Sequence, residues 1–251
     1  MSRYDACRNA VYCETRMNQH EQLPSLLRLC LSMTVRMTAF AVALLWPAGT
    51  WQWWEAWALI VLWMGFAIAT AVFLMRHDPA LLAERMKTSP VQKGQKTWDK
   101  ILLLLFLIPG IGIYLIPGFD VVRFGWSTPL PVWIEIIAMV VHLPAFAFIA
   151  WVMRENTFLA RVVKIDDERG HQVITTGPYA LVRHPMYSAV IVLIFAVPLS
   201  LGSRFGLIPA GIAVILLVVR TYLEDRTLYE ELPGYPEYSQ VTTYRLIPGV
   251  W

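Results

Sequence analysis

Charged residues are scarce in this chain, and that scarcity decides its broad class. Of 251 residues only 16% are charged whereas 57% are apolar, and the mean hydropathy is +0.52. An ordinary soluble domain has about 25% charged residues, so this composition excludes that class and indicates a membrane protein surrounded by lipids. The net charge of +3 does not indicate nucleic-acid binding, because the basic residues lie at the ends of apolar segments and form no continuous patch.

Cysteine is also rare. The three cysteines, Cys7, Cys13 and Cys30, lie within the first thirty residues, and their odd number and spacing favour neither a disulfide framework nor a metal site. We therefore expect no bound metal. The first residues lack the basic start, short apolar core and small-residue cleavage site of a signal peptide. We interpret residues 1–25 as a polar N-terminal extension.

Six apolar segments approach or reach the length of about 20 residues that a helix needs to cross a bilayer. They cover residues 29–47, 53–75, 101–119, 131–153, 187–201 and 205–223. Short links predict a tight hairpin at each end of the series, and Pro109 and Pro144 predict kinks in the third and fourth segments. We predict an all-α integral membrane protein with about six transmembrane helices. Residues 26–153 would form a four-helix membrane region, and residues 154–251 a C-terminal region with a transmembrane hairpin.

The lysines and arginines give this topology an orientation. If both termini and the loops at 76–100 and 154–186 lie in the cytoplasm, 19 of the 21 basic residues lie on that side, and Arg123 and Arg204 lie on the other. We therefore expect a multi-pass protein with both termini and its catalytic region on the cytoplasmic side. Four tryptophans are expected to anchor the opposite interface: Trp51, Trp53, Trp54 and Trp57.

The stretch 175–187, TTGPYALVRHPMY, places a Gly-Pro turn, two tyrosines and an Arg-His-Pro cluster directly before an apolar segment. Irregular backbone at a membrane edge is tolerated where protein or a water-filled cavity satisfies it, which indicates a ligand crevice. Pro185 suits the first turn of a helix, where backbone donors near His184 could face a polar ligand. Tyr179 and Tyr187 offer aromatic faces to an adenine ring or a sulfonium cation, and either also suits an interfacial belt.

Arg220 and Glu224 follow one apolar segment later, four residues apart and so on one helical face. A surface ion pair is one interpretation of this spacing. Ionisable side chains at a membrane edge also tend to mark functional sites, because leaving them unpaired in hydrocarbon is costly. His142, in the fourth segment, is a weaker candidate, and we expect it to be a buried histidine bonded to a backbone carbonyl.

Together the two parts resemble the isoprenylcysteine carboxyl methyltransferase family and its phospholipid N-methyltransferase relatives. The family pattern is a G-x-Y turn, R-H-P-x-Y, a transmembrane hairpin and an arginine four residues before a Glu-Glu pair. The likeness covers roughly the last 80 residues, with Asp225 in place of the second glutamate. It implies that Arg220 faces the methyl acceptor. It also implies an S-adenosylmethionine pocket lined by His171, Gln172, Val173, Ile174, Tyr179, His184, Pro185, Met186, Tyr187 and Glu224.

The resemblance thus implies a membrane methyltransferase that passes the methyl group of S-adenosylmethionine directly to a lipophilic or small acceptor, an isoprenylcysteine-like carboxylate being one candidate. A carboxylate needs no base, whereas a thiol or an amine would need one within hydrogen-bond reach. The predicted catalytic residues are Arg220, Glu224 and His184. Phospholipid N-methylation, thiol S-methylation, a sterol-reductase-like enzyme using NADPH and a non-catalytic membrane protein remain alternatives. The sequence leaves the oligomeric state open.

Overall fold

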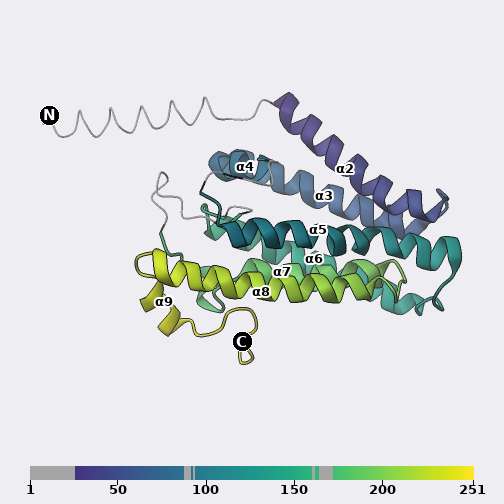
Figure 1. Ribbon diagram of the computed structural model, residues 1–251. Helices are drawn as coiled ribbons and strands as arrows, with labels where there is room; N and C mark the ends of the chain where they lie inside the picture. Colours follow the sequence, from purple (N-terminus) through teal and green to yellow (C-terminus); the bar gives the residue numbers. More distant parts are fainter. Residues whose placement is uncertain (1–25, 88–91, 93, 160–161, 164–171) are drawn as a thin grey trace, which may run out of the picture.

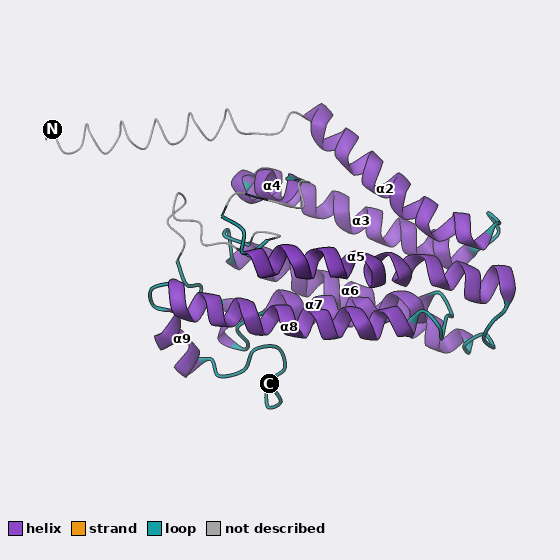
Figure 2. Ribbon diagram, in the orientation of Figure 1, coloured by secondary structure: helices purple, strands orange, loops and turns teal. Residues whose placement is uncertain are grey.

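Helices joined by turns and irregular loops make up the described chain, which in this computed structural model comprises residues 26–87, 92, 94–159, 162–163 and 172–251. Within these ranges there is no strand (Figure 2). The predicted all-α class is therefore confirmed for this part of the chain.

In the described part of the chain, five helices are long and apolar enough to cross a membrane. They are α2 (Leu26–Ala48), α3 (Trp54–His77), α5 (Thr97–Pro117) with its continuation η1 (Gly118–Phe124), α6 (Val132–Glu155) and α8 (Leu207–Glu231). The fifth predicted segment, residues 187–201, is an apolar helix too, α7 (Pro185–Ser200), but its 16 residues fall short of the roughly 20 that a bilayer needs. The number of spans thus stays a prediction, whereas the multi-pass class is supported.

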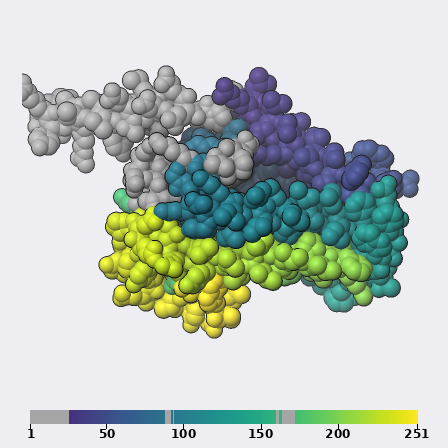
Figure 3. All heavy atoms as spheres, viewed as in Figure 1, coloured from purple at the N-terminus to yellow at the C-terminus, as the bar shows by residue number. Residues whose placement is uncertain are grey.

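The long helices run side by side, up and down the bundle (Figure 1). The turns between α2 and α3 and between α7 and α8 lie at one end. The short helices α4 (Pro79–Met86) and α9 (Tyr235–Val241) lie at the other end, with the C-terminal residues. In the space-filling view the yellow residues of α9 and the C-terminus form one mass with the end of α8 (Figure 3). The prolines do not break their helices, although η1, which follows Pro117, is π-helical.

Small residues allow the helices to approach one another closely. Ala210 and Ala213 of α8 are completely buried in the core that α8 shares with α2, α3, α5 and α7. At Gly118 a Cβ atom would lie only 2.8 Å from the backbone nitrogen of Ala48, so only glycine fits where η1 crosses the end of α2. The outward faces instead carry exposed apolar side chains such as Ile108, which suits a lipid environment.

The predicted tryptophan cluster divides between the surface and the core. Trp51, Trp54 and Trp57 are exposed, in keeping with interfacial anchors, but Trp53 is 4% exposed and packs in the core. The anchor prediction is therefore wrong for Trp53, because its position just before α3 turns the ring inward.

A buried carboxylate ties together the end of the bundle that is distant from α9. Asp120 of η1 is completely buried and accepts hydrogen bonds from Ser127 N and Oγ at 2.9 and 3.0 Å. It also accepts bonds from Ser203 Oγ at 2.6 Å and from Phe205 N at 3.3 Å. One side chain thus joins η1, the loop before α6 and the turn between α7 and α8.

Replacing Asp120 should destabilise this end. Asp120→Ala removes the acceptor for several buried donors, so we expect a loss of about 3 kcal/mol, which corresponds to roughly 6 to 12 °C in melting temperature for a chain of this size. Thermal melting of the purified protein in detergent measures the effect. Arg204→Gln, at an exposed position in the same turn, is the matched control and should leave the melting temperature unchanged. Equal melting temperatures for Asp120→Ala and the unaltered protein would contradict the assigned role.

Candidate active site

A cavity of about 340 Å³ opens among the helices at the α9 end of the bundle. Its walls come from α4, α5, α7, α8 and α9, and from the segments between α6 and α7. Ten of the eleven predicted site residues line it: Gln172, Val173, Ile174, Tyr179, His184, Pro185, Met186, Tyr187, Arg220 and Glu224. His171 lies outside the described residues. The structure therefore brings three separate stretches of sequence to one cavity.

Tyr187 links the two predicted polar residues of α8. Its hydroxyl donates a hydrogen bond to Glu224 Oε2 at 2.5 Å, and Arg220 Cζ lies 5.5 Å from the centre of its ring. The ring of His184 stacks nearly parallel to it, with 5.9 Å between ring centres. The aromatic surface that the sequence offers to a ligand is thus already in contact with two side chains of the protein. Tyr187 holds Glu224 and Arg220 in place relative to each other.

Arg220 has a carboxylate partner that sequence reasoning missed. Its Nε donates to Asp99 Oδ1 at 2.8 Å. Asp99 lies in the first turn of α5 and is completely buried. Its other oxygen, Oδ2, accepts bonds from Gln95 Nε2 at 2.9 Å and from Val163 N at 3.0 Å. No motif points to this residue, because it is 121 positions from Arg220.

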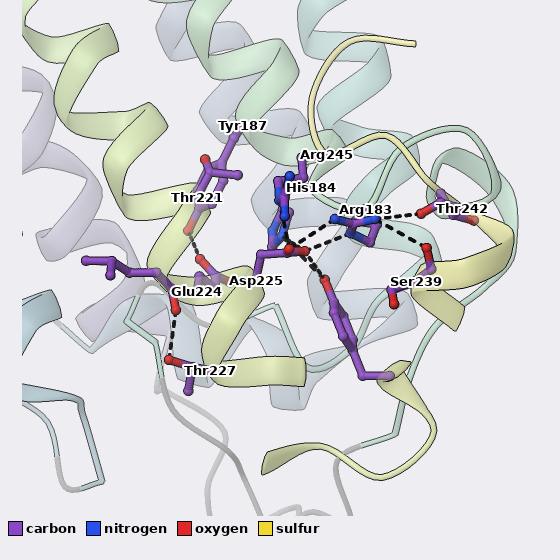
Figure 4. A network of polar contacts seen from close by, with 12 residues as sticks. Arg183, His184, Tyr187, Thr221, Glu224, Asp225, Thr227, Ser239, Thr242 and Arg245 are labelled. Carbon is purple, nitrogen blue, oxygen red and sulfur yellow. Dashed lines mark hydrogen bonds and ion pairs between the residues drawn. The ribbon is translucent and has the colours of Figure 1, made fainter. Parts of the chain in front are cut away.

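Asp225 is the centre of a second network (Figure 4). Its carboxylate accepts two bonds from the guanidinium of Arg183, from Nε at 2.7 Å and from Nη2 at 3.0 Å. Arg245 Nε and the Tyr235 hydroxyl each donate to it at 2.8 Å. His184 Nε2 lies 3.2 Å from the same carboxylate. Bidentate, charge-assisted bonds of this kind are short and directional, so the network orients the His184 ring toward Asp225.

The C-terminal segment, residues 242–251, is hydrogen-bonded to the residues at the start of α7. Arg183 Nη1 donates to the carbonyl oxygens of Thr242 and Thr243, both at 2.9 Å. The backbone N–H groups of Arg183 and His184 donate to the carbonyl oxygens of Tyr244 and Arg245, again at 2.9 Å. The sequence suggested that backbone donors near His184 face a ligand. These two instead bond the C-terminal segment.

Burial and charge shift several pKa values in the segments outside the spans. Burial by itself would lower the pKa of the Arg183 guanidinium, but the hydrogen bonds and negative charge of Asp225 raise it, so Arg183 stays charged. Burial, followed by the charge of Asp225, raises the pKa of Tyr235. Burial raises the pKa of Tyr238 to about 12, and its hydroxyl donates to the carbonyl oxygen of Tyr179 at 2.6 Å.

The comparison with protein families agrees with this geometry. Residues 136–230 match the isoprenylcysteine carboxyl methyltransferase (ICMT) family. The match confirms the resemblance seen in the sequence and supports a membrane methyltransferase. A comparison with curated proteins gives no match to the chain.

The ICMT match covers less than half of the chain and only part of the cavity. It includes His184, Arg220 and Glu224, but Asp99 and Arg245 lie outside it. Sequence reasoning also left Arg183, Asp225 and Arg245 out of the site, although all three stand in or beside the motifs. His142 lies outside the cavity lining, is completely buried and bonds the carbonyl oxygen of Ala138 at 2.9 Å through Nδ1. It is thus the structural histidine that the sequence predicted.

Removing Asp225 should release the C-terminal segment. Asp225→Ala leaves the buried guanidinium of Arg183 without its carboxylate, which costs about 3 to 5 kcal/mol. We expect trypsin to cleave after Arg245 faster than in the unaltered protein, and mass spectrometry of the fragments measures the rate. Glu230→Gln removes the solvent-exposed ion pair with Arg226 on the same helix and serves as control, because exposed pairs contribute little to stability. An unchanged rate of cleavage in Asp225→Ala would show that Asp225 does not hold the C-terminal segment in place.

Tyr238 should make the α9 end sensitive to alkaline pH. An unfolded tyrosine has a pKa of about 10, whereas in the folded protein the pKa of Tyr238 is raised to about 12. The folded state therefore favours the neutral hydroxyl; its stabilising effect is complete below about pH 10 and is lost as the pH rises through about 12. Melting temperatures measured across this range should fall, and less steeply for Tyr238→Phe. Identical slopes in the two proteins would count against this assignment.

Proposed function

We propose that the protein is an S-adenosylmethionine-dependent methyltransferase of the membrane that acts on a lipophilic or small acceptor. The proposal rests on the way in which residues from separate segments of the chain meet at one cavity. The residues that the ICMT resemblance assigns to cofactor and acceptor come from the segment before α7, from α7 and from α8, and those that are described line one cavity. The ICMT match supports methyl transfer over the NADPH-dependent alternative.

The cavity suits the cofactor in size, and a carboxylate, that of Glu224, lies in its lining. Its volume of about 340 Å³ lies within the range of ligand pockets, roughly 300 to 1,000 Å³. Residues 172–174, Tyr179 and residues 184–187 would hold the cofactor. S-adenosylmethionine, when bound, supplies an electrophilic methyl group on a positively charged sulfur. Glu224, held by the Tyr187 hydroxyl, offers a carboxylate to positive charge.

The part of the cavity between α5, α7 and α8 is apolar. Its lining there consists of Leu102, Leu103, Phe106, Val190, Leu216 and Leu217. An apolar wall of this kind beside Arg220 favours an acceptor with a hydrocarbon portion and a polar reactive group. Isoprenylcysteine-like carboxylates, aminophospholipids and lipophilic thiols all meet this description. Exclusion of water by these side chains, together with fixed positions for the reacting groups, is the main catalytic contribution that we propose.

The polar residues have different tasks in this proposal. With a carboxylate acceptor no proton has to be removed, and Arg220 holds the carboxylate through charge-assisted hydrogen bonds. With a thiol or an amine, Glu224 is a better base than His184, because His184 Nε2 is directed at Asp225. His184, which the sequence predicted as a catalytic residue, would instead shape the cavity wall through its stacking on Tyr187.

Ligand binding to the detergent-purified protein tests the proposal. We expect S-adenosylmethionine and S-adenosylhomocysteine to bind and NADPH not to bind. Glu224→Gln should weaken binding of both adenosyl ligands at least about tenfold, since a hydrogen bond to a charged group contributes about 1.5 to 3 kcal/mol. Glu230→Gln, on the exposed face of the same helix, is the control and should bind normally.

Transfer of a radiolabelled methyl group into S-prenylcysteine, aminophospholipid and thiol acceptors then identifies the substrate. Binding of NADPH without binding of the adenosyl ligands would replace this proposal by the reductase alternative. Binding of the adenosyl ligands without turnover of any acceptor would favour a non-catalytic protein.

A further inference from the structure

The carboxylate of Asp99 is completely buried, although Asp99 lies in the first turn of α5, beside the predicted cytoplasmic loop. Taking an ion out of water costs several kcal/mol even after the protein relaxes around it, and a buried ion pair is by itself weak evidence of stability. Asp99 is nevertheless completely buried and receives three donors, one of them from Arg220. A leucine in this place would leave the Arg220 guanidinium without this carboxylate and the donors of Gln95 and Val163 without their acceptor. The carboxylate therefore acts chiefly on its partners, and Arg220 is the one of them with a predicted role in the site.

We propose that Asp99 is a positioning residue that sets the direction of the Arg220 guanidinium in the candidate active site. The guanidinium is planar and its donors form a rigid fork. A bond from Nε to Asp99 Oδ1 at 2.8 Å fixes one edge of that plane, and the Tyr187 ring at 5.5 Å from Cζ contacts the group as well. Asp99 is itself held by Gln95 and Val163, so it cannot turn with Arg220.

The same face of α5 both holds Arg220 and forms the apolar wall of the cavity. Leu102, Leu103 and Phe106 follow Asp99 at three, four and seven positions, which places all four side chains on one helical face. Helix α5 thus fixes the distance between the Arg220 guanidinium, which in our proposal binds the polar group of the acceptor, and the apolar wall. This helix lies outside the region that matches the ICMT family, so this chain builds part of its acceptor site from its own N-terminal half.

Asp99 also limits the contacts that the Arg220 guanidinium can make with other carboxylates. Glu224 lies one helical turn from Arg220 and is a competing carboxylate for the guanidinium. By holding Nε, Asp99 restricts how far the Arg220 guanidinium can turn toward Glu224. Loss of the Asp99 charge should therefore change the binding of the acceptor, whereas residues 172–174 and Tyr179, which the proposal assigns to the cofactor, are not among the hydrogen-bond partners of Asp99 described above. The catalytic meaning of this inference rests on the proposed function.

A double-mutant cycle on the full chain tests the inference. The variants are Asp99→Asn, Arg220→Gln and the double variant, with Asp120→Asn as the matched control, because Asp120 is also a completely buried aspartate but lies at the other end of the bundle. The readouts are the affinity for S-adenosylhomocysteine and the kcat and KM of methyl transfer to an S-prenylcysteine. A purely structural role of Asp99 would act on all of these together.

We expect Asp99→Asn to leave S-adenosylhomocysteine affinity within about threefold and to lower kcat/KM for the acceptor about 10- to 100-fold. The double variant should be no worse than Arg220→Gln alone, because Asp99 acts through Arg220. Asp120→Asn should lower the melting temperature and leave the KM of the acceptor unchanged. Losses that multiply in the double variant, or unaltered kinetics in Asp99→Asn, would overturn the inference.

An NMR measurement tests the role of Asp99 independently of the proposed function. It applies even when the prenylcysteine is not methylated or S-adenosylhomocysteine does not bind. The Nε–H resonance of Arg220 in NMR spectra, assigned by its loss in Arg220→Gln, should exchange slowly with solvent. In Asp99→Ala it should exchange at least about tenfold faster, the ratio that corresponds to about 1.4 kcal/mol. Equal exchange in the two proteins would show that Asp99 does not hold the guanidinium.

Discussion

The bonds to the Asp225 carboxylate are the constraint on which the α9 end of the molecule depends. Four side chains from three parts of the chain converge on this one group: Arg183, His184, Tyr235 and Arg245. A carboxylate or a guanidinium left unpaired in a protein interior costs several kcal/mol, so each partner needs the other. The loop before α7, the end of α8, α9 and the C-terminal segment are therefore held as a unit, and this unit closes one side of the cavity.

Neighbouring acidic residues on α8 serve two different surroundings. Successive residues of an α-helix point about 100° apart. Glu224 therefore lines the cavity and bonds Tyr187, whereas Asp225 faces Arg183 and the C-terminal segment. In the family pattern this pair is Glu-Glu, and here the shorter aspartate receives the guanidinium of Arg183 in two bonds. The aspartate thus stands at the position that bonds Arg183, whereas the position that faces the cavity is a glutamate, as in the family pattern.

Much of the fold and of the site could be predicted from the sequence, since both leave local signals. Each of the six apolar segments is a helix, and ten predicted site residues line one cavity. Asp99 could not be predicted, because its importance comes from the packing of α5 against α8. Trp53 was misplaced for a related reason. Composition shows that a tryptophan suits an interface, but only the direction of the chain before α3 decides whether its ring points in or out.

The sequence by itself determined the membrane class, the helical architecture and the candidate residues of the motifs, because hydropathy and helix length act over short stretches of chain. Tertiary structure alone decided which carboxylate pairs with which arginine. Arg220 and Glu224 have the spacing of a surface ion pair, yet the hydrogen bond from Arg220 Nε goes to Asp99 and that from the Tyr187 hydroxyl goes to Glu224. Buried charges must be paired at short range, and only the packed helices determine which groups come within that range.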